Sequence, residues 1–291
     1  SKNKKSDDTE RIQKALDMVG RYPADDNGIR GAVLLKAGTY RISSPLTISQ
    51  SGIVLKGEGD GHESVTHHSK PLGPANWFDY AHSEKEEKGV TKLVATWISD
   101  AYDKNTAIIT IGGGKAKDVW STEITDQYVP VNDVKIHVKD VSGLEAGDVI
   151  RIERAVNGAW AHDLRMDSIT DAPGILSENQ WAENGKILPA YKGISQERRI
   201  KAVLEDAIVL EEPLVDPLNM KYGISRIYKT DCSSRVRNSG VENMMLMSRF
   251  DKNSTSTNSA YDKVYKFYDD ESHAQVGIKI LNAEDVWARR I

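Results

Sequence analysis

The chain has 291 residues and a formal net charge of −4, with 39% hydrophobic and 28% charged residues. This balance is typical of a globular protein, and the slight acidity argues against general nucleic-acid binding. No apolar run approaches the roughly 18 residues of a membrane-spanning helix, and residues 1–10 lack the apolar region of a signal peptide. Cys232 is the single cysteine, so no intrachain disulfide can form.

The first predicted element is a short amphipathic helix over residues 8–20. Asp7 and Glu10 have the spacing of a capping box, with Asp7 at the N-cap. Apolar residues then recur at helical spacing, and Gly20 follows as a stop signal.

After the helix the pattern changes to very short β runs. Within residues 32–59 these runs are separated by bends that contain Gly, Pro or Ser. Strands this short suit a coil in which three strands make one turn and successive turns stack in parallel, with the helix capping one end. Periodicity alone also allows an antiparallel sandwich. The predicted coil strands are 32–36, 53–56, 92–95, 107–111, 241–247 and 276–281.

Residues 124–216 show a different pattern. The stretch DVKIHV alternates apolar and polar residues, and residues 198–214 are typical of a hairpin. We therefore predict three parts: a cap helix and first coils over 1–123, an inserted antiparallel β module over 124–216, and further coils over 217–291. A long loop with two tryptophans lies within the module, and long loops are often functional.

Three stretches carry a family resemblance. SDDTERIQKALDMV, GAVLLKAGTYRISSPLTI and GIVLKGEGDG, all within residues 6–61, resemble the N-terminal signature of the pectate-lyase-like superfamily of right-handed parallel β-helices. The module sequence GLEAGDVIRIER and the later DESHA and WAR stretches resemble one branch of it. The resemblance implies an all-β, right-handed parallel β-helix with a groove for polysaccharides, and it implies that more coils follow this portion of the chain.

The cluster that precedes the last predicted strand is the candidate catalytic site. It contains Asp269, Asp270, Glu271 and His273. Two carboxylates can serve glycoside hydrolysis, one as an acid and one as a base or nucleophile. A cation with a base such as histidine can instead serve elimination from a uronic acid, and these oxygens could hold Ca²⁺. The alternative is a solvated turn. We predict that Asp270, Glu271 and His273 lie within hydrogen-bonding or one-water distance of one another, in a cleft that faces the tryptophan-containing loop.

Candidate substrate-binding residues are arginines near residues 240–248 and aromatic residues in loops. Arginine binds sugar carboxylates through two parallel hydrogen bonds, and flat aromatic faces pack on sugar rings. Each set also has a plain alternative: a solvated strand edge for the arginines, and packing of the module for the aromatics. The set is Arg235, Arg237, Arg249, Trp160, Trp181, Tyr261 and Tyr265.

Two function classes follow from these observations. The first is a secreted, periplasmic or cell-surface enzyme that cleaves an acidic polysaccharide, as a lyase or a glycoside hydrolase. The second is a non-catalytic glycan-binding or adhesin-type protein, because one fold can host both roles. The two differ in whether carboxylates and a base converge in one groove.

Overall fold

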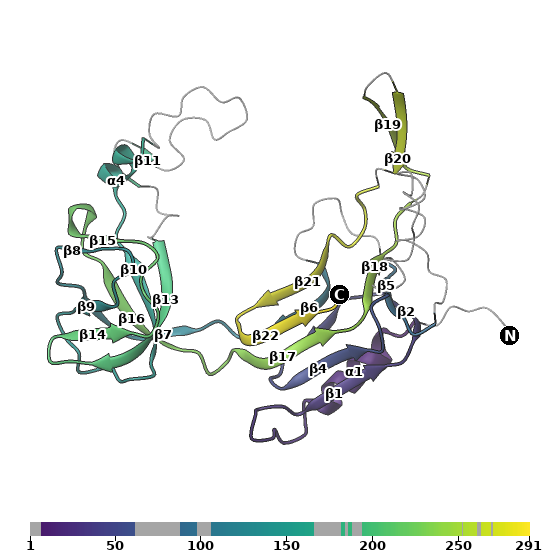
Figure 1. The fold of residues 1–291 in the computed structure, drawn as a ribbon, viewed down its shortest axis with the longest axis horizontal. Helices are drawn as coiled ribbons and strands as arrows, with labels where there is room; N and C mark the ends of the chain where they lie inside the picture. The colour runs from purple at the N-terminus through teal and green to yellow at the C-terminus, as the bar shows by residue number, and fades with distance from the viewer. Residues whose placement is uncertain are drawn as a thin grey trace. The chain divides into compact units, whose positions relative to one another are not determined.

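The computed structural model describes residues 7–61, 88–97, 106–165, 182–183, 186–187, 194–251, 253–260, 263–268 and 270–291. The chain forms two compact units (Figure 1). The first, called the coil, contains Ser1–Lys115 and Ser234–Ile291. The second, called the module, contains Ala116–Ser233.

The coil is built from three parallel sheets. Sheet one has the order β1-β4-β17-β22, sheet two β18-β5-β2 and sheet three β21-β6-β3. Successive strands belong to different sheets, so the chain returns to each sheet one layer further along. This arrangement confirms the predicted right-handed parallel β-helix. The bounds are β1 Gly31–Leu35, β2 Gly38–Ile42, β3 Leu46–Ile48, β4 Ile53–Gly57, β5 Thr91–Ala95, β6 Ala107–Gly112, β17 Val236–Glu242, β18 Met245–Ser248, β21 Val276–Leu281 and β22 Ala283–Arg289.

Stacked aliphatic side chains fill the coil. Because side chains alternate along a strand, every second residue points inward and meets its neighbour in the next layer. In sheet three, for example, Ile111 pairs in register with Ile48 on one side and Ile280 on the other. Ile48 and Ile111 are fully buried and belong to the hydrophobic core of the coil.

Helix α1, Thr9–Val19, lies against the first layer, where it contacts β1, β3 and β4 (Figure 1). Its buried face contains Ile12 and Leu16, which are 2% and 1% exposed. The Gln13 side chain donates from Nε2 to the carbonyl of Thr47 at 3.0 Å and accepts from its N–H at 2.9 Å. The helix therefore covers the end of the core and also satisfies the backbone of an edge strand.

The predicted capping box is wrong. The N-cap is Asp8, and its side chain makes no capping hydrogen bond. Asp7 instead accepts from the N–H and hydroxyl of Thr9 and from the hydroxyl of Ser43. The Glu10 carboxylate pairs with Lys14. The carboxylate at the start of the helix thus ties α1 to the chain between β2 and β3, which a local sequence pattern cannot reveal.

The predicted strand 241–247 is divided in two. Asn243 has a φ of 55°, in the left-handed region, and turns the chain from β17 in sheet one to β18 in sheet two. Asparagine tolerates this conformation better than most residues. The turn is therefore encoded by one residue inside an otherwise apolar run.

The module is an antiparallel sheet of order β7-β16-β10-β13-β14-β9, with a second pair, β15-β8. Its strands β7 and β16 lie outside residues 124–216, so the compact unit is wider than that range. It has its own core, in which Ile136, Ile150, Ile152 and Ile208 are fully buried. The bounds are β7 Lys117–Glu123, β8 Tyr128–Val129, β9 Lys135–His137, β10 Val149–Arg154, α4 Gly158–Asp163, β11 Ala182–Glu183, β12 Lys186–Ile187, β13 Ile194–Val203, β14 Ala207–Leu210, β15 Leu218–Asn219, the 3₁₀ helix η2 Met220–Tyr222 and β16 Arg226–Asp231.

A hairpin, β19 Thr255–Ala260 with β20 Lys263–Tyr268, lies between β18 and β21 in the sequence. Within the described ranges, no helix is long and apolar enough to cross a membrane.

Candidate functional site

The outer face of sheet one carries two rows of side chains. Leu55 and Val241 point into the core and are fully buried, so their neighbours along each strand point outward. The strand register aligns these outward residues across four strands. An apolar row contains Ala32, Val54, Gly240 and Trp287, and a second row contains Leu34, Lys56, Glu242 and Arg289.

The Trp287 side chain lies over Gly240 in the neighbouring strand. A Cβ atom added to Gly240 would lie 2.3 to 2.6 Å from three atoms of the indole ring. Since real Cβ atoms do not approach ring atoms this closely, the absence of a side chain at Gly240 makes room for the ring. Trp287 is partly exposed on the outside of the coil. It therefore presents an aromatic surface on the sheet.

Glu242 anchors this tryptophan. Its side chain is 8% exposed. Its Oε1 accepts from the indole Nε1–H of Trp287 at 2.8 Å and from the Arg289 guanidinium at 3.0 Å. The Lys56 ammonium lies 3.7 Å from Oε2. The row thus holds one nearly buried carboxylate between two cations and an indole N–H.

The protonation state of Glu242 follows from these contacts. Burial alone would raise its pKa, but the hydrogen bonds from Trp287 and Arg289, with the charges of Arg289 and Lys56, outweigh burial and lower the pKa below its ordinary value. Glu242 is therefore a carboxylate at neutral pH. This state suits an anchor or a base, and it does not suit a general acid, which needs a raised pKa.

Two of the predicted arginines meet at one carboxylate beside the two rows. Arg235 donates to Glu284 Oε1 at 2.8 Å, and Arg237 Nε lies 2.9 Å from Oε2. The Arg237 contact is a close ion pair without hydrogen-bond alignment. Arg237 is 42% exposed. Four cations and two carboxylates thus lie on or beside this face: Lys56, Arg235, Arg237 and Arg289 against Glu242 and Glu284. With the exposed Asp285 of β22 included, the face has an excess of one positive charge.

The predicted catalytic cluster is placed in a turn before β21. Asp270 accepts from the N–H groups of Asp251 and Ser272, at 2.5 and 2.8 Å. These hydrogen bonds lower the Asp270 pKa. His273 Nδ1 lies 3.1 Å from the carbonyl oxygen of Ala274, and Glu271 is exposed. Asp270 thus serves the local backbone, and Asp269 lies outside the described residues.

A metal site is not apparent in the part of the chain that the structure describes. No group of three or more histidine, cysteine, aspartate or glutamate side chains there could hold an ion. The proposed Ca²⁺ ligands Asp270 and Glu271 belong to that part of the chain.

The remaining predicted binding residues that the structure describes with their side chains, Arg249 and Trp160, lie in different units. The Arg249 N–H donates to the Ala95 carbonyl at 3.0 Å in the coil. Trp160 lies in α4 of the module, 5.1 Å from the Arg154 guanidinium. Trp181 and Tyr261 lie outside the described residues, as does the side chain of Tyr265 in β20.

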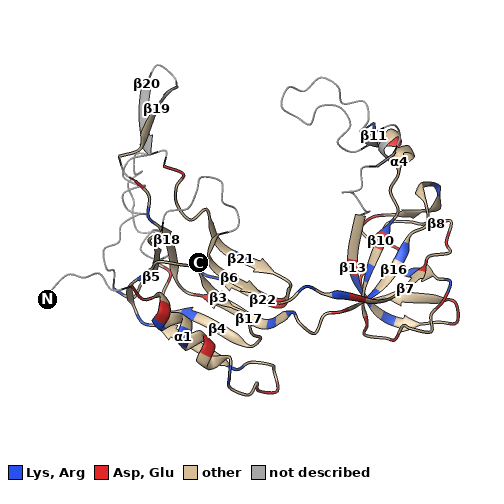
Figure 2. Ribbon diagram, turned by 180° about the vertical axis from the view of Figure 1, so that it is seen from behind, with Lys and Arg blue, Asp and Glu red and all other residues tan. Residues whose placement is uncertain are grey.

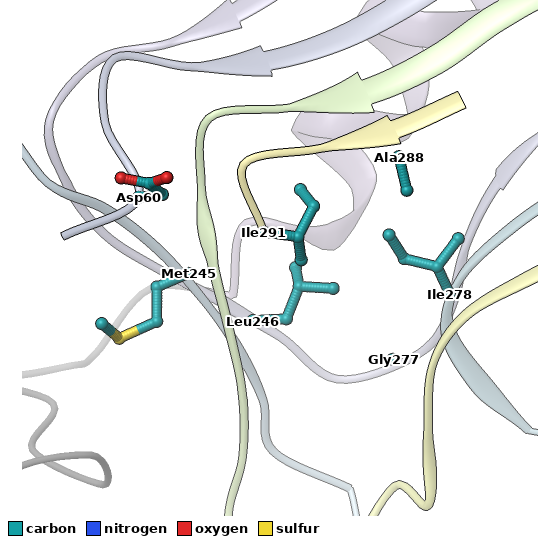
Figure 3. A pocket seen from close by; sticks show the side chains of 7 residues that line it. All are labelled: Asp60, Met245, Leu246, Gly277, Ile278, Ala288 and Ile291. Atoms are coloured by element: carbon teal, nitrogen blue, oxygen red, sulfur yellow. The ribbon is translucent and has the colours of Figure 1, made fainter. Parts of the chain in front are cut away.

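A pocket of about 590 Å³ opens at the last layer of the coil (Figure 3). Six of its seven lining residues have no charged or hydroxyl group, and the seventh is Asp60. Since saccharides need several hydrogen-bonding partners, this lining suits aliphatic packing better than sugar binding. The residues are Asp60, Met245, Leu246, Gly277, Ile278, Ala288 and Ile291.

The site on sheet one is largely absent from the sequence prediction. Arg235 and Arg237 were identified, whereas Lys56, Glu242, Trp287 and the role of Gly240 were not. Lys56, Glu242 and Trp287 lie between 45 and 231 positions apart in the sequence, and only the parallel register aligns the strands that carry them. The one local signal is the alternation of charged and aromatic residues with apolar ones in β22.

Comparisons with known proteins give a weak likeness. No protein-family model matches the chain, and no curated protein sequence is similar to it. Among solved structures, the chain is similar to the Gp54 tailspike of Acinetobacter baumannii bacteriophage AP22 in complex with capsular saccharide, with 9% identity, a TM-score of 0.38 and coverage of 82% of this chain and 29% of the tailspike.

Two further tailspikes are similar. For gp49 of Pseudomonas phage LKA1, the identity is 12% and the TM-score 0.37, over 83% of this chain and 29% of that one. For gp61 of Pseudomonas phage phi297, the identity is 9% and the TM-score 0.39, over 97% of this chain and 30% of that one. The chain thus spans under a third of the length of these proteins, and its fold is assigned from its own strand pairing.

Proposed function

We propose that the chain binds a polysaccharide on the outer face of sheet one. The observation that carries this proposal is the Trp287 indole, which lies over Gly240 while its N–H is held by the ionised Glu242. Because the indole N–H is already hydrogen-bonded, the ring is held in place and can pack on the apolar face of a sugar ring without first moving.

The proposed ligand is acidic. The excess of positive charge on this face favours uronate or other anionic groups, and Arg237 and Arg289 are exposed enough to reach them. Such polysaccharides occur outside cells, so we propose a secreted, periplasmic or cell-surface location. We also propose membership of the pectate-lyase-like superfamily, based on the motifs of residues 6–61.

Cleavage of the polysaccharide is the second candidate function. The feature that favours it is the presence of Asp270, Glu271 and His273 within four residues of one another before β21. Elimination would need His273 as a base and a cation beside the uronate, whereas hydrolysis would need one carboxylate with a raised pKa. Because the Asp270 pKa is lowered, Glu271 would have to supply the acid.

The test is a binding and cleavage assay on a panel of polysaccharides. Polygalacturonate, alginate, a bacterial capsular saccharide and neutral dextran would be titrated calorimetrically against the full chain. We expect binding of an anionic member, and a Trp287→Ala variant should weaken it by about tenfold, which corresponds to about 1.4 kcal/mol. Trp287→Phe should retain part of the affinity, because a flat ring remains.

The control is Tyr128→Ala, which removes an exposed aromatic side chain of the module. It should leave this affinity unchanged. Equal binding by wild type and Trp287→Ala would exclude the sheet-one site. Cleavage would appear as absorbance of unsaturated products near 235 nm for elimination, or as new reducing ends for hydrolysis, and its loss in His273→Ala would assign the catalytic cluster.

A further inference from the structure

A second aromatic cluster lies in the module, where β10, α4 and η2 meet. Arg154 is the last residue of β10 and is 6% exposed. Its NH1 group donates to both carboxylate oxygens of Asp216, at 2.6 Å each. An arginine this deeply buried requires such a partner, because an unpaired charge in a protein interior is strongly unfavourable.

The Arg154 guanidinium supports the Trp160 ring. The Cζ atom lies 5.1 Å from the indole centroid and 6.0 Å from the centroid of Tyr222. The backbone of Trp160 is fixed as well, because its N–H donates to the Asn157 side chain at 3.0 Å. Trp160 and Tyr222 are both partly exposed. The cluster therefore presents aromatic surface from a rigid support.

Polar groups border these rings. Asp163, at the end of α4, accepts from the Lys221 ammonium at 2.6 Å and from the Tyr222 hydroxyl at 2.8 Å. These two hydrogen bonds lower the Asp163 pKa, so the group is a carboxylate at neutral pH. With Arg154 and Asp216, the cluster holds two cations and two carboxylates and has no net charge.

One donor of the cluster is unsatisfied. Within the described residues, the Nε–H of Arg154 is buried and has no hydrogen-bond partner. Buried donors in proteins are nearly always paired. An acceptor supplied from outside the protein, such as a sugar hydroxyl reached by a small rearrangement of the rings, would satisfy it.

We propose that Arg154, Trp160, Asp163 and Tyr222 form a second saccharide subsite, specific for a neutral hexopyranose. Sugar rings combine apolar C–H faces with many hydroxyl groups, and this cluster combines aromatic surface with charged donors and acceptors. The balanced charge distinguishes it from sheet one, where positive charge is in excess. The module would thus bind a neutral residue independently of the acidic ligand proposed for the coil.

The test uses saturation-transfer difference NMR on the full chain. The probes are the methyl glycosides of glucose, galactose, mannose and N-acetylglucosamine, with sodium galacturonate as the charged comparator. We expect saturation transfer to at least one neutral glycoside, and insensitivity of that signal to added salt. Trp160→Ala should abolish the signal, whereas Tyr22→Ala, which removes an exposed aromatic side chain of the coil, should leave it unchanged.

Two conservative variants distinguish a loss of binding from a loss of folded structure. Trp160→Phe keeps a ring on the guanidinium and should retain a weakened signal. Tyr222→Phe keeps its ring but removes one of the two hydrogen bonds to Asp163, and should alter which ring protons of the glycoside are saturated. An absent signal with all four neutral glycosides would refute the subsite. So would a signal that persists in Trp160→Ala. Because Trp287 acts only in the coil, failure here leaves the sheet-one proposal standing.

Discussion

Two isoleucine residues at opposite ends of the coil differ strongly in how far their side chains are exposed. Ile48 in β3 and Ile280 in β21 occupy the same inward row of sheet three, and each lies in an edge strand. Ile48 is fully buried, whereas Ile280 is 44% exposed. The difference is helix α1, which packs against β3. An inward direction within a β-helix thus ensures burial only where a further layer or a cap covers the row.

The largest expected effect comes from shortening one apolar side chain at each end of the coil. Leu16→Ala in the cap should lower the free energy of unfolding by about 2–5 kcal/mol, because it leaves a cavity between α1 and the first layer. Ile280→Ala should cost about 1 kcal/mol or less, because much of its surface is already in water. Urea unfolding measures both. Equal losses would mean that the cap contributes little more than an exposed edge.

Acid should weaken the capped end selectively. Hydrogen bonds from Ser43, and then from Thr9, lower the Asp7 pKa from 3.8 to about 2. A folded-state pKa below the unfolded value means that the stabilisation is complete above about pH 4 and is lost as the pH falls towards about 2. Asp7→Asn should therefore lower the Tm at pH 7, and the difference from wild type should shrink between pH 4 and 2.

Ser43→Ala provides the matching control for Asp7. It removes the largest single cause of the pKa shift and should reproduce part of the loss at pH 7. A difference between wild type and Asp7→Asn that stays constant over this pH range would contradict the link between ionisation and cap docking.

The smallest expected effect concerns turns in the last layers. Asn243 and Arg290 occupy corresponding turn positions, with φ values of 55° and 56°. Arginine is less suited than asparagine to this left-handed conformation. Arg290→Asn should therefore stabilise the protein by less than about 1 kcal/mol, partly offset by the loss of its 3.8 Å ion pair with Asp60. The reverse substitution, Asn243→Arg, should destabilise the protein by a similar or larger amount, as urea unfolding would show.

The sequence predicted the layers of the coil better than its surface. Short β runs with tight bends, and the motifs of residues 6–61, predicted both the parallel coil and α1. The break at Asn243 was missed because one residue in a left-handed conformation interrupts an apolar run without a glycine or proline. The pair of Gly240 and Trp287 was missed because their contact depends on strand register, which neither local segment specifies.

The cluster before β21 shows the opposite difficulty. Asp270, Glu271 and His273 are adjacent in the sequence, and their residue types suit catalysis. In the structure, Asp270 accepts two backbone N–H groups, a role that short acidic side chains often have in turns. Sequence proximity therefore could not distinguish a reactive cluster from a turn motif, and only variants can separate the two roles.

Gln13 has a consequence for how copies of this chain can associate. Its amide gives β3 one donor and one acceptor, as the peptide group of another strand would. Open sheet edges invite pairing between molecules, and head-to-tail pairing at both ends of a coil would produce unlimited fibres. Because α1 occupies one end, a second copy cannot add there in the same way. Helix α1 and Gln13 therefore protect the β3 edge from pairing with a strand of another molecule.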